Sequence, residues 1–353
     1  MGTDTHALSN QSLCEFLQKM IQTPSLSGEE SALADMIAAK MRCFSFDSVT
    51  IDPMGNVIGR IGSGPRALLF DGHMDTVRAD DRQCWSADPF SGQVQEGRIY
   101  GRGSADMKSG LAAAIYAASR SQEKVASDQT VYVTATVDEE FCDGVALGYV
   151  LDHLPHQPEA VVICEPSDNC IVHSQRGKAL LLVETRGKSS HGSAPELGIN
   201  AVYEMAEIIQ RVQKLSLQLL GDKHAGSITL SEINSHANSL NAVPDRCAIC
   251  LDRRLSQWES QHTVSQEMAT LIAETSATWS VRTLERQSWN GQPLVYHPFH
   301  DPWTLELESP LGVLACQAWK SVFPSSPATI DWPFSTNAVA ATARGIPVLG
   351  FGP

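Results

Sequence analysis

Hydrophobic residues in the first third of the chain alternate between helical and strand-like spacing. Residues 13–20 carry apolar side chains at helical spacing, and Asn10 in front of them is a suitable N-cap. Ser27 and Glu30 have the spacing of a capping box ahead of a second helix. Apolar strands follow at 49–53, 56–62, 67–74, 130–138 and 159–165, with a helix at 111–119. Apolar strands alternating with helices predict an α/β sheet covered on both faces, whose ligands gather beyond the strand ends.

The pattern changes from about Ala179. A strand at 179–187 precedes a long amphipathic helix from Asn200 to Leu219. Strands at 226–234 and 246–255, a helix near 265–277 and a strand at 279–287 complete the order β–α–β–β–α–β, which predicts a ferredoxin-like unit. A helix at 312–322 and a strand at 346–352 end the chain. We therefore predict an α/β domain at residues 1–177 and 288–353, interrupted by an inserted domain at 178–287.

Composition narrows the class of protein. The chain of 353 residues is 42% hydrophobic and 19% charged, as in a globular protein. Its net charge of −14 argues against a nucleic-acid partner and against an anionic membrane surface, because both favour a basic face. Apolar runs stop well short of the ~20 residues that a membrane helix needs. The first residues lack the basic start and apolar core of a secretory signal.

Nine cysteines are scattered along the chain, and an odd number without an export signal predicts reduced thiols in the cytoplasm. Cys247 and Cys250 have the spacing of a zinc knuckle, but no second pair accompanies them. We therefore interpret these two as packing residues of a strand.

Acidic residues follow several of the predicted strands. The run TATVDEEF places Asp138, Glu139 and Glu140 side by side at the end of an apolar strand. Buried carboxylates this close repel one another unless a cation compensates them, although a solvated loop is the simpler interpretation. His73 and Asp75 follow another strand, and Asp106 and Glu165 occupy similar positions. Together these residues predict a site for two metal ions at one edge of the sheet, for which zinc is the best fit and cobalt or manganese are alternatives.

Five segments carry a family resemblance: LFDGHMDTV, GRGSADMKSG, VDEE, ICEPS and SSHGSAPE. They resemble the signature segments of the aminoacylase-type dizinc metallohydrolases, which include acetylornithine deacetylase, succinyl-diaminopimelate desuccinylase and glutamate carboxypeptidase. The match runs in the family's order from about residue 10 to the last residue. The segments SQRGKALLLVETRG, HGSAPELGINA and FSTNAVAATARGIPVLGFGP look most like a subgroup described as selenium-metabolism hydrolases.

The resemblance implies a zinc-peptidase-like catalytic domain with a mixed central sheet and an inserted domain that serves as lid and dimerisation unit. It implies four metal ligands, which are His73, Asp106, Glu140 and Glu165. Of these, Asp106 would bridge the two ions. Asp75 would hydrogen-bond His73, and Glu139 would be the general base that takes a proton from water. Asp138 receives no role.

Three further residues match family positions around the substrate. His191 corresponds to a histidine that stabilises the tetrahedral oxyanion, usually from the partner subunit, although an ordinary surface histidine is an equal alternative. Asn241 and Arg254 correspond to residues that hold the substrate's carboxylate, and Arg253 is the alternative arginine because neighbours in a strand point oppositely. The resemblance thus implies a homodimer that acts on a small N-acyl amino acid or dipeptide-like substrate.

The chain departs from the family pattern at its end. The family has another histidine shortly after a GFGPG segment as a ligand of the second metal, whereas this chain stops at Pro353. His297 and His300 are candidate substitutes, although histidines in a proline-rich loop are more often solvent-exposed. Two hypotheses remain: a metal-dependent amide hydrolase, or a truncated, non-catalytic relative that folds and dimerises with an incomplete second metal site.

Overall fold

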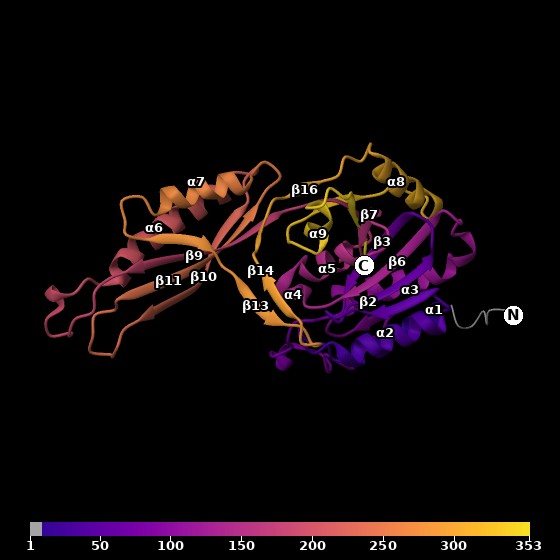
Figure 1. The fold of residues 1–353 in the computed structure, drawn as a ribbon, viewed down its shortest axis with the longest axis horizontal. Helices are drawn as coiled ribbons and strands as arrows, with labels where there is room; N and C mark the ends of the chain where they lie inside the picture. Colours follow the sequence, from indigo (N-terminus) through magenta and orange to yellow (C-terminus); the bar gives the residue numbers. More distant parts are fainter. Residues whose placement is uncertain (1–8) are drawn as a thin grey trace.

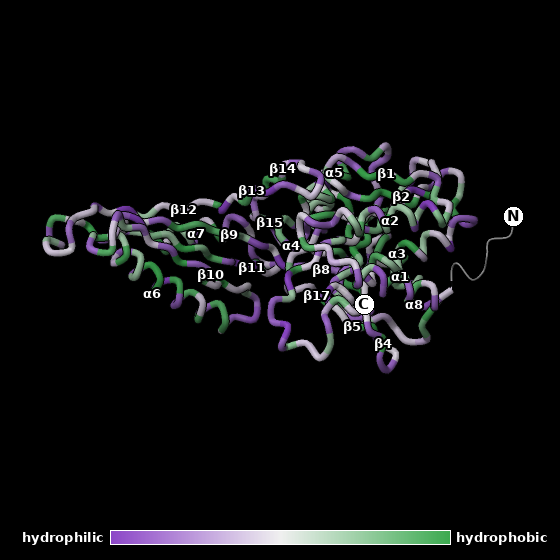
Figure 2. The backbone as a smooth tube through the Cα atoms, turned by 90° about the horizontal axis from the view of Figure 1, so that it is seen from below, coloured by the Kyte–Doolittle hydropathy of each residue, from purple (hydrophilic) through white to green (hydrophobic). Residues whose placement is uncertain are grey.

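The computed structural model describes residues 9–353, so the N-terminal segment that bears on a secretory signal lies mostly outside it. The chain forms two bodies joined end to end, each built on its own large sheet (Figure 1). Figure 2 shows the same elongated outline from a second direction. Among the described residues, none of the helices combines the length and the apolar character that a membrane span requires.

The larger body contains a nine-stranded mixed sheet. Its strands, in spatial order, are β1 (Ser48–Ile51), β2 (Val57–Gly62), β6 (Gln129–Thr136), β3 (Arg66–His73), β7 (Pro158–Ile163), β18 (Val348–Gly350), β8 (Ile171–Gln175) and β16 (Trp303–Thr304), with β17 (Thr329–Trp332) beside β8. The pairs β6–β3 and β3–β7 are parallel, whereas β1–β2 and β2–β6 are antiparallel. The predicted mixed central sheet is therefore confirmed.

Helices cover both faces of this sheet, as the alternating pattern predicted. One core packs beneath α1 (Asn10–Gln22), α2 (Ser31–Cys43) and α3 (Ser109–Arg120), and the core on the other face lies beneath α5 (Val145–His153) and α9 (Ala338–Thr342). The helix α8 (Pro310–Val322) packs at the margin of the second core. A small hairpin of β4 (Gln93–Gln95) and β5 (Arg98–Tyr100) lies outside the sheet.

The smaller body has the predicted ferredoxin-like topology. Its elements are β9 (Gly177–Arg186), α6 (Ala201–Leu220), β10 (Ser227–His236), β11 (Arg246–Leu255), α7 (Gln261–Leu271) and β12 (Thr278–Val281). The strands lie in the antiparallel order β10-β11-β9-β12, and β15 (Phe299–His300) adds to β9. Met205 of α6 and Met268 of α7 share one core with the strands, so both helices cover the same face. The domain boundaries at 177/178 and 287/288 stay a prediction.

Several predicted element ends are wrong, each for a local reason. Ser9, not Asn10, is the N-cap of α1, because the Ser9 side chain accepts from the Ser12 amide. Ser27 and Glu30 form no capping box, because the Ser27 hydroxyl donates to Asp75 instead.

Two predicted elements of the smaller body also differ. The helix α7 begins and ends several residues earlier than expected, after a capping box of Ser260 and Thr263. The strand expected at 279–287 is broken, because β12 stays in the smaller sheet while β13 (Leu284–Gln287) pairs with β14 (Pro293–Tyr296). The chain leaves the smaller body at this break. Cys247 and Cys250 are buried free thiols, as their interpretation as packing residues required.

Candidate metal centre

The predicted metal ligands meet at one edge of the larger sheet. The strands β6, β3 and β7 are adjacent and parallel, so their carboxyl ends open in the same direction. His73 is the last residue of β3, and Glu165 follows the end of β7. Glu139 and Glu140 begin α4 (Glu139–Cys142), the short helix that follows β6. Asp106 comes from the turn Ser104–Lys108 in front of α3.

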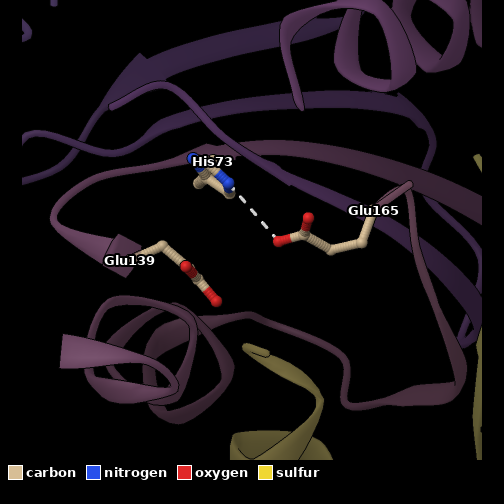
Figure 3. A group of neighbouring side chains, drawn as sticks. All are labelled: His73, Glu139 and Glu165. Carbon is tan, nitrogen blue, oxygen red and sulfur yellow. Dashed lines mark ion pairs between the residues drawn. The ribbon is translucent and has the colours of Figure 1, made fainter. Parts of the chain in front are cut away.

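These side chains form two groups that share His73. His73, Glu139 and Glu165 offer ligand atoms within 4.8 Å of one another, and so do His73, Asp106 and Glu140. Figure 3 shows the three side chains of the first group directed toward a common space. His73 Nε2 lies 3.0 Å from Asp106 Oδ1 and 3.4 Å from Glu165 Oε1. One imidazole and four carboxylates thus converge on one small volume.

The electrostatics of this cluster call for a cation. Burial raises the pKa of Glu139 well above its usual value, and the charge of Glu165 adds to the shift. Burial also raises the pKa of Glu140 to about 7. Burial alone would lower the pKa of His73, but Glu165 and Asp106 around it raise that pKa well above its usual value. Glu139 Oε1 is buried without a hydrogen-bond partner among the described residues. The donors present therefore fit divalent metal ions.

Asp75 lies behind the cluster and organises it. Its carboxylate accepts hydrogen bonds from the backbone amides of Glu139, over 3.0 Å, and Glu140, over 3.1 Å. The Ser27 hydroxyl donates to Asp75 over 2.6 Å, and His73 Nδ1 lies 2.9 Å from the Asp75 backbone carbonyl and 3.4 Å from Asp75 Oδ1. Burial alone would raise the pKa of Asp75, but these contacts, led by His73, hold it below its usual value. The structure therefore places Asp75 beside His73, and its role in orienting that histidine stays a prediction.

Asp138, which has no role in the sequence pattern, is a buried residue with a left-handed backbone (φ 52°). Its carboxylate lies 3.4 Å from Arg286 Nε, and its amide donates to Glu30 Oε1. Burial and Asp75 raise the pKa of Asp138 to about 6 and that of Glu30 to about 8. The sequence did not suggest that Glu30 lies beside these acids, because a glutamate near the start of a helix is typical of a capping residue.

A cavity of about 280 Å³ opens over the metal-ligand candidates. Arg254 of the smaller body lines it together with Glu139 and Glu140. Arg253 points into its own body, where it is fully buried and paired with Glu259 and Glu267. Of the two alternatives, Arg254 is therefore the arginine that faces the cavity.

The same cavity contains residues that the sequence pattern did not reveal. Asp143, Lys178 and Ser335 line it. They come from the end of α4, the start of β9 and the loop before α9, so only the fold brings them together. Asp143 follows Glu140 by three residues, which is the one signal that could have suggested it.

His191 and Asn241 lie elsewhere in the described chain. Both line a separate cavity of about 590 Å³ in the smaller body, and neither lines the cavity over the metal-ligand candidates. His191 is exposed, and its Nδ1 lies 2.8 Å from the Ser193 hydroxyl. Within one copy of the chain, these two residues are therefore apart from the site.

The two candidate substitute histidines do not join the cluster. His300 Nε2 lies 3.3 Å from the Tyr296 hydroxyl, and His297 Nδ1 lies 3.0 Å from the Thr283 hydroxyl. Within residues 9–353, neither belongs to a group of side chains that could hold a metal ion.

Residues 69–353 match the family model described as peptidase family M20/M25/M40. The chain belongs to this family. The chain is 37% identical over 347 residues to the uncharacterized protein YgeY of Escherichia coli (strain K12), a match that covers 97% of this chain and 86% of YgeY. It is 29% identical over 276 residues to succinyl-diaminopimelate desuccinylase of Cereibacter sphaeroides (strain KD131), covering 72% of each chain.

A solved structure extends the comparison to the fold. The Bacillus subtilis protein YXEP, described as a dinuclear metal binding peptidase from the M20 family, is 13% identical to this chain with a TM-score of 0.66. The match covers 97% of this chain and 88% of that one. Membership of the M20 family makes the chain a metallohydrolase of the deacylase and peptidase type, and the non-catalytic alternative is not favoured.

Proposed function

We propose that this protein hydrolyses the amide bond of a small N-acyl amino acid or dipeptide-like substrate with the help of two divalent metal ions. The observation that carries the proposal is the pair of ligand groups that share His73 at the edge of the sheet. Mixed nitrogen and oxygen donors suit zinc best, and cobalt or manganese accept the same donors.

Four side chains would hold the two ions. His73 and Glu165 would serve one ion, Glu140 would serve the other, and Asp106 would serve both; all four belong to the two groups of side chains that converge around His73. When bound, such ions polarise the amide carbonyl and lower the pKa of water.

Glu139 is the proposed general base. Its carboxylate lines the cavity, one of its oxygens is free of hydrogen bonds within the described chain, and burial raises its pKa well above the usual value. A carboxylate of raised pKa is the stronger base, so Glu139 can take a proton from the attacking water and return it to the leaving amine.

Arg254 is the proposed ligand of the substrate's carboxylate. Two of its nitrogens are engaged by Asp252 at 2.7 and 3.0 Å, which fixes the guanidinium plane and leaves donors toward the cavity. The named relative, succinyl-diaminopimelate desuccinylase, is by its name a deacylase of an N-acyl amino acid, which supports this substrate class.

His191 and Asn241 would complete the site of a second copy of the chain. Both belong to the smaller body and line a cavity of their own, which supports a role outside their own subunit. We therefore propose a homodimer in which each lid contributes to the partner's site.

Two measurements test the proposed function. Metal analysis with a calorimetric zinc titration should find two zinc ions per chain, and the zinc-loaded protein should release amine from N-acyl amino acids. A chain that binds less than one zinc and releases no amine from a panel of such substrates would be a non-catalytic relative.

A further inference from the structure

One carboxylate in the wall of the cavity over the metal-ligand candidates accepts hydrogen bonds at both of its oxygens. Asp143 is buried, and its Oδ1 accepts from Lys178 Nζ over 2.8 Å and from the Tyr296 hydroxyl. Its Oδ2 accepts from the Ser335 hydroxyl. Burial alone would raise the pKa of Asp143, but Lys178 and these hydroxyls lower it. Asp143 therefore carries a negative charge inside the cavity and is not a spare metal ligand.

The Lys178 side chain also lines this cavity, with N–H groups that are not bonded to Asp143. Its side chain is 14% exposed, and it lines the cavity with Glu139, Arg254 and Asp143. An ammonium group has three donors, and Asp143 is the single hydrogen-bond acceptor that the structure gives it. The Tyr296 ring lies 5.4 Å from Lys178 Nζ and covers another side of the group. The remaining donors are in position to contact a molecule in the cavity.

The two cations of the cavity differ in how their charge is balanced. Asp252, the partner of Arg254, has a 28% exposed side chain and does not line the cavity, so water screens its charge. Asp143, the partner of Lys178, is buried and does line the cavity, so its charge acts within it at low dielectric. The cavity can therefore hold an anion at Arg254, whereas at Lys178 the charge of Asp143 offsets most of the attraction for one.

Resting on the proposed function, we propose that Lys178 contacts the substrate and donates a hydrogen bond to an uncharged oxygen, while Asp143 offsets the attraction that Lys178 would otherwise exert on a second carboxylate. The preferred substrates are then N-acyl amino acids with a neutral acyl group, such as acetyl, over those with an acidic acyl group, such as succinyl. Because the pair has no net charge, an acidic acyl group would lose its hydration there without gaining a compensating ion pair.

The test compares N-acetyl and N-succinyl forms of one amino acid with the zinc-loaded enzyme. Asp143→Asn keeps the shape, and the Ser335 hydroxyl can accept from the new amide, but Lys178 loses its balancing charge. The acetyl-over-succinyl ratio of kcat/KM should be well above one in the wild type and fall by about tenfold or more in this variant. Lys178→Met should weaken binding of the acetyl form.

Asp152→Asn is the matched control, because it removes a carboxylate from an exposed ion pair with Arg344 outside the cavity. Its ratio should equal that of the wild type. An unchanged ratio in Asp143→Asn, or a wild type that prefers the succinyl form, would overturn the proposal. Calorimetric titration of the Glu139→Gln variant, which should not turn the compounds over, compares their dissociation constants and should also favour the acetyl form. An absence of hydrolysis would therefore count against the proposed function while the selectivity is still measured.

Discussion

The carboxylate of Asp75 holds the backbone amide of Glu139 at 3.0 Å from its Oδ1. Its Oδ2 accepts from the amide of Glu140, while His73 Nδ1 lies 3.4 Å from Oδ1. The Asp75 side chain thus fixes the start of α4, and it lies beside the imidazole at the end of β3, whose Nδ1 is 2.9 Å from the Asp75 backbone carbonyl. The position of the base candidate and the orientation of the histidine are therefore coupled.

Asp75→Asn should weaken zinc binding by about 10–100-fold, the usual effect of removing a residue that orients a metal-bound histidine. An asparagine offers only one oxygen, so at least one of the two amides of α4 loses its acceptor. Competitive zinc titration at neutral pH measures the change, with Asp152→Asn as the control. Wild-type zinc affinity in Asp75→Asn would show that this carboxylate does not organise the metal site.

Glu139→Gln should lower kcat by about 10²–10⁴-fold with two zinc ions still bound, because only the proton acceptor is removed. Glu140→Gln is the matched variant on the neighbouring residue and should instead lower the zinc stoichiometry. Metal analysis of both purified proteins beside their kinetics separates the roles. If Glu139→Gln binds one zinc ion fewer than the wild type, then Glu139 is a metal ligand. Its position in the group with His73 and Glu165 allows this role geometrically.

The neighbouring arginines should respond differently to substitution. Arg254→Gln should raise KM by about 10–100-fold, which corresponds to one charge-assisted hydrogen bond, and leave unfolding unchanged. Arg253→Gln should lower the free energy of unfolding by about 3–5 kcal/mol, because it leaves Glu259 and Glu267 without their buried partner. Steady-state kinetics and denaturant unfolding of both variants provide the comparison. Reversed effects would mean that the cavity-facing arginine was misassigned.

Glu30 should make the metal-free protein less stable as the pH rises. Burial raises its pKa from 4.5 to about 8, so the folded state prefers the protonated form and loses stability between about pH 4.5 and 8. Glu30→Gln keeps the oxygen that accepts from Asp138 and removes this loss. The difference in free energy of unfolding between the variant and the wild type should therefore grow in favour of the variant by roughly 3 kcal/mol from pH 5 to pH 8.

Urea unfolding in the presence of a chelator measures this difference at the two pH values. Glu159→Gln, on an exposed glutamate paired with Arg66, is the control and should show no such pH-dependent gain. A pH-independent effect of Glu30→Gln would mean that Glu30 is ionised in the folded protein.

The sequence pattern predicted those features that depend on short-range order. The alternation of apolar runs predicted the strand that ends at His73 and the strand that ends just before Glu165, and parallel neighbours necessarily open at one edge. The β–α–β–β–α–β order predicted the ferredoxin-like body, because each of its elements is recognised from a short stretch of the sequence. Element ends were less predictable. The Ser27 hydroxyl could cap a helix or bond elsewhere, and only the folded chain shows that it donates to Asp75.

Long-range partners could not be predicted. Asp143, Lys178 and Ser335 meet from segments up to 192 residues apart, and no local periodicity records such a meeting. The buried acid Glu30 looked like a helix cap, and its true neighbour Asp138 lies 108 residues away. The roles of the site residues and the likeness to selenium-metabolism hydrolases stay predictions.

His191 lies in the smaller body with Asn241, in a cavity distinct from that of the metal-ligand candidates. If it acts on the partner's site, two variants that are each inactive can rescue one another. Glu139→Ala destroys the site of its own subunit, whereas His191→Ala destroys the partner's site. A mixed dimer then keeps one intact site, built from Glu139 of one subunit and His191 of the other.

Co-expression of Glu139→Ala with His191→Ala should therefore restore about a quarter of wild-type activity, since half of randomly paired dimers carry one working site of two. Glu139→Ala with Glu165→Gln is the control pair, because both changes affect the site of their own subunit and no pairing restores it. The rescued activity should fall on dilution as the dimers dissociate. Zero activity in the test pair, with dimers verified by sedimentation, would place His191 in its own subunit's site, and full activity of the His191→Ala protein alone would place it outside catalysis.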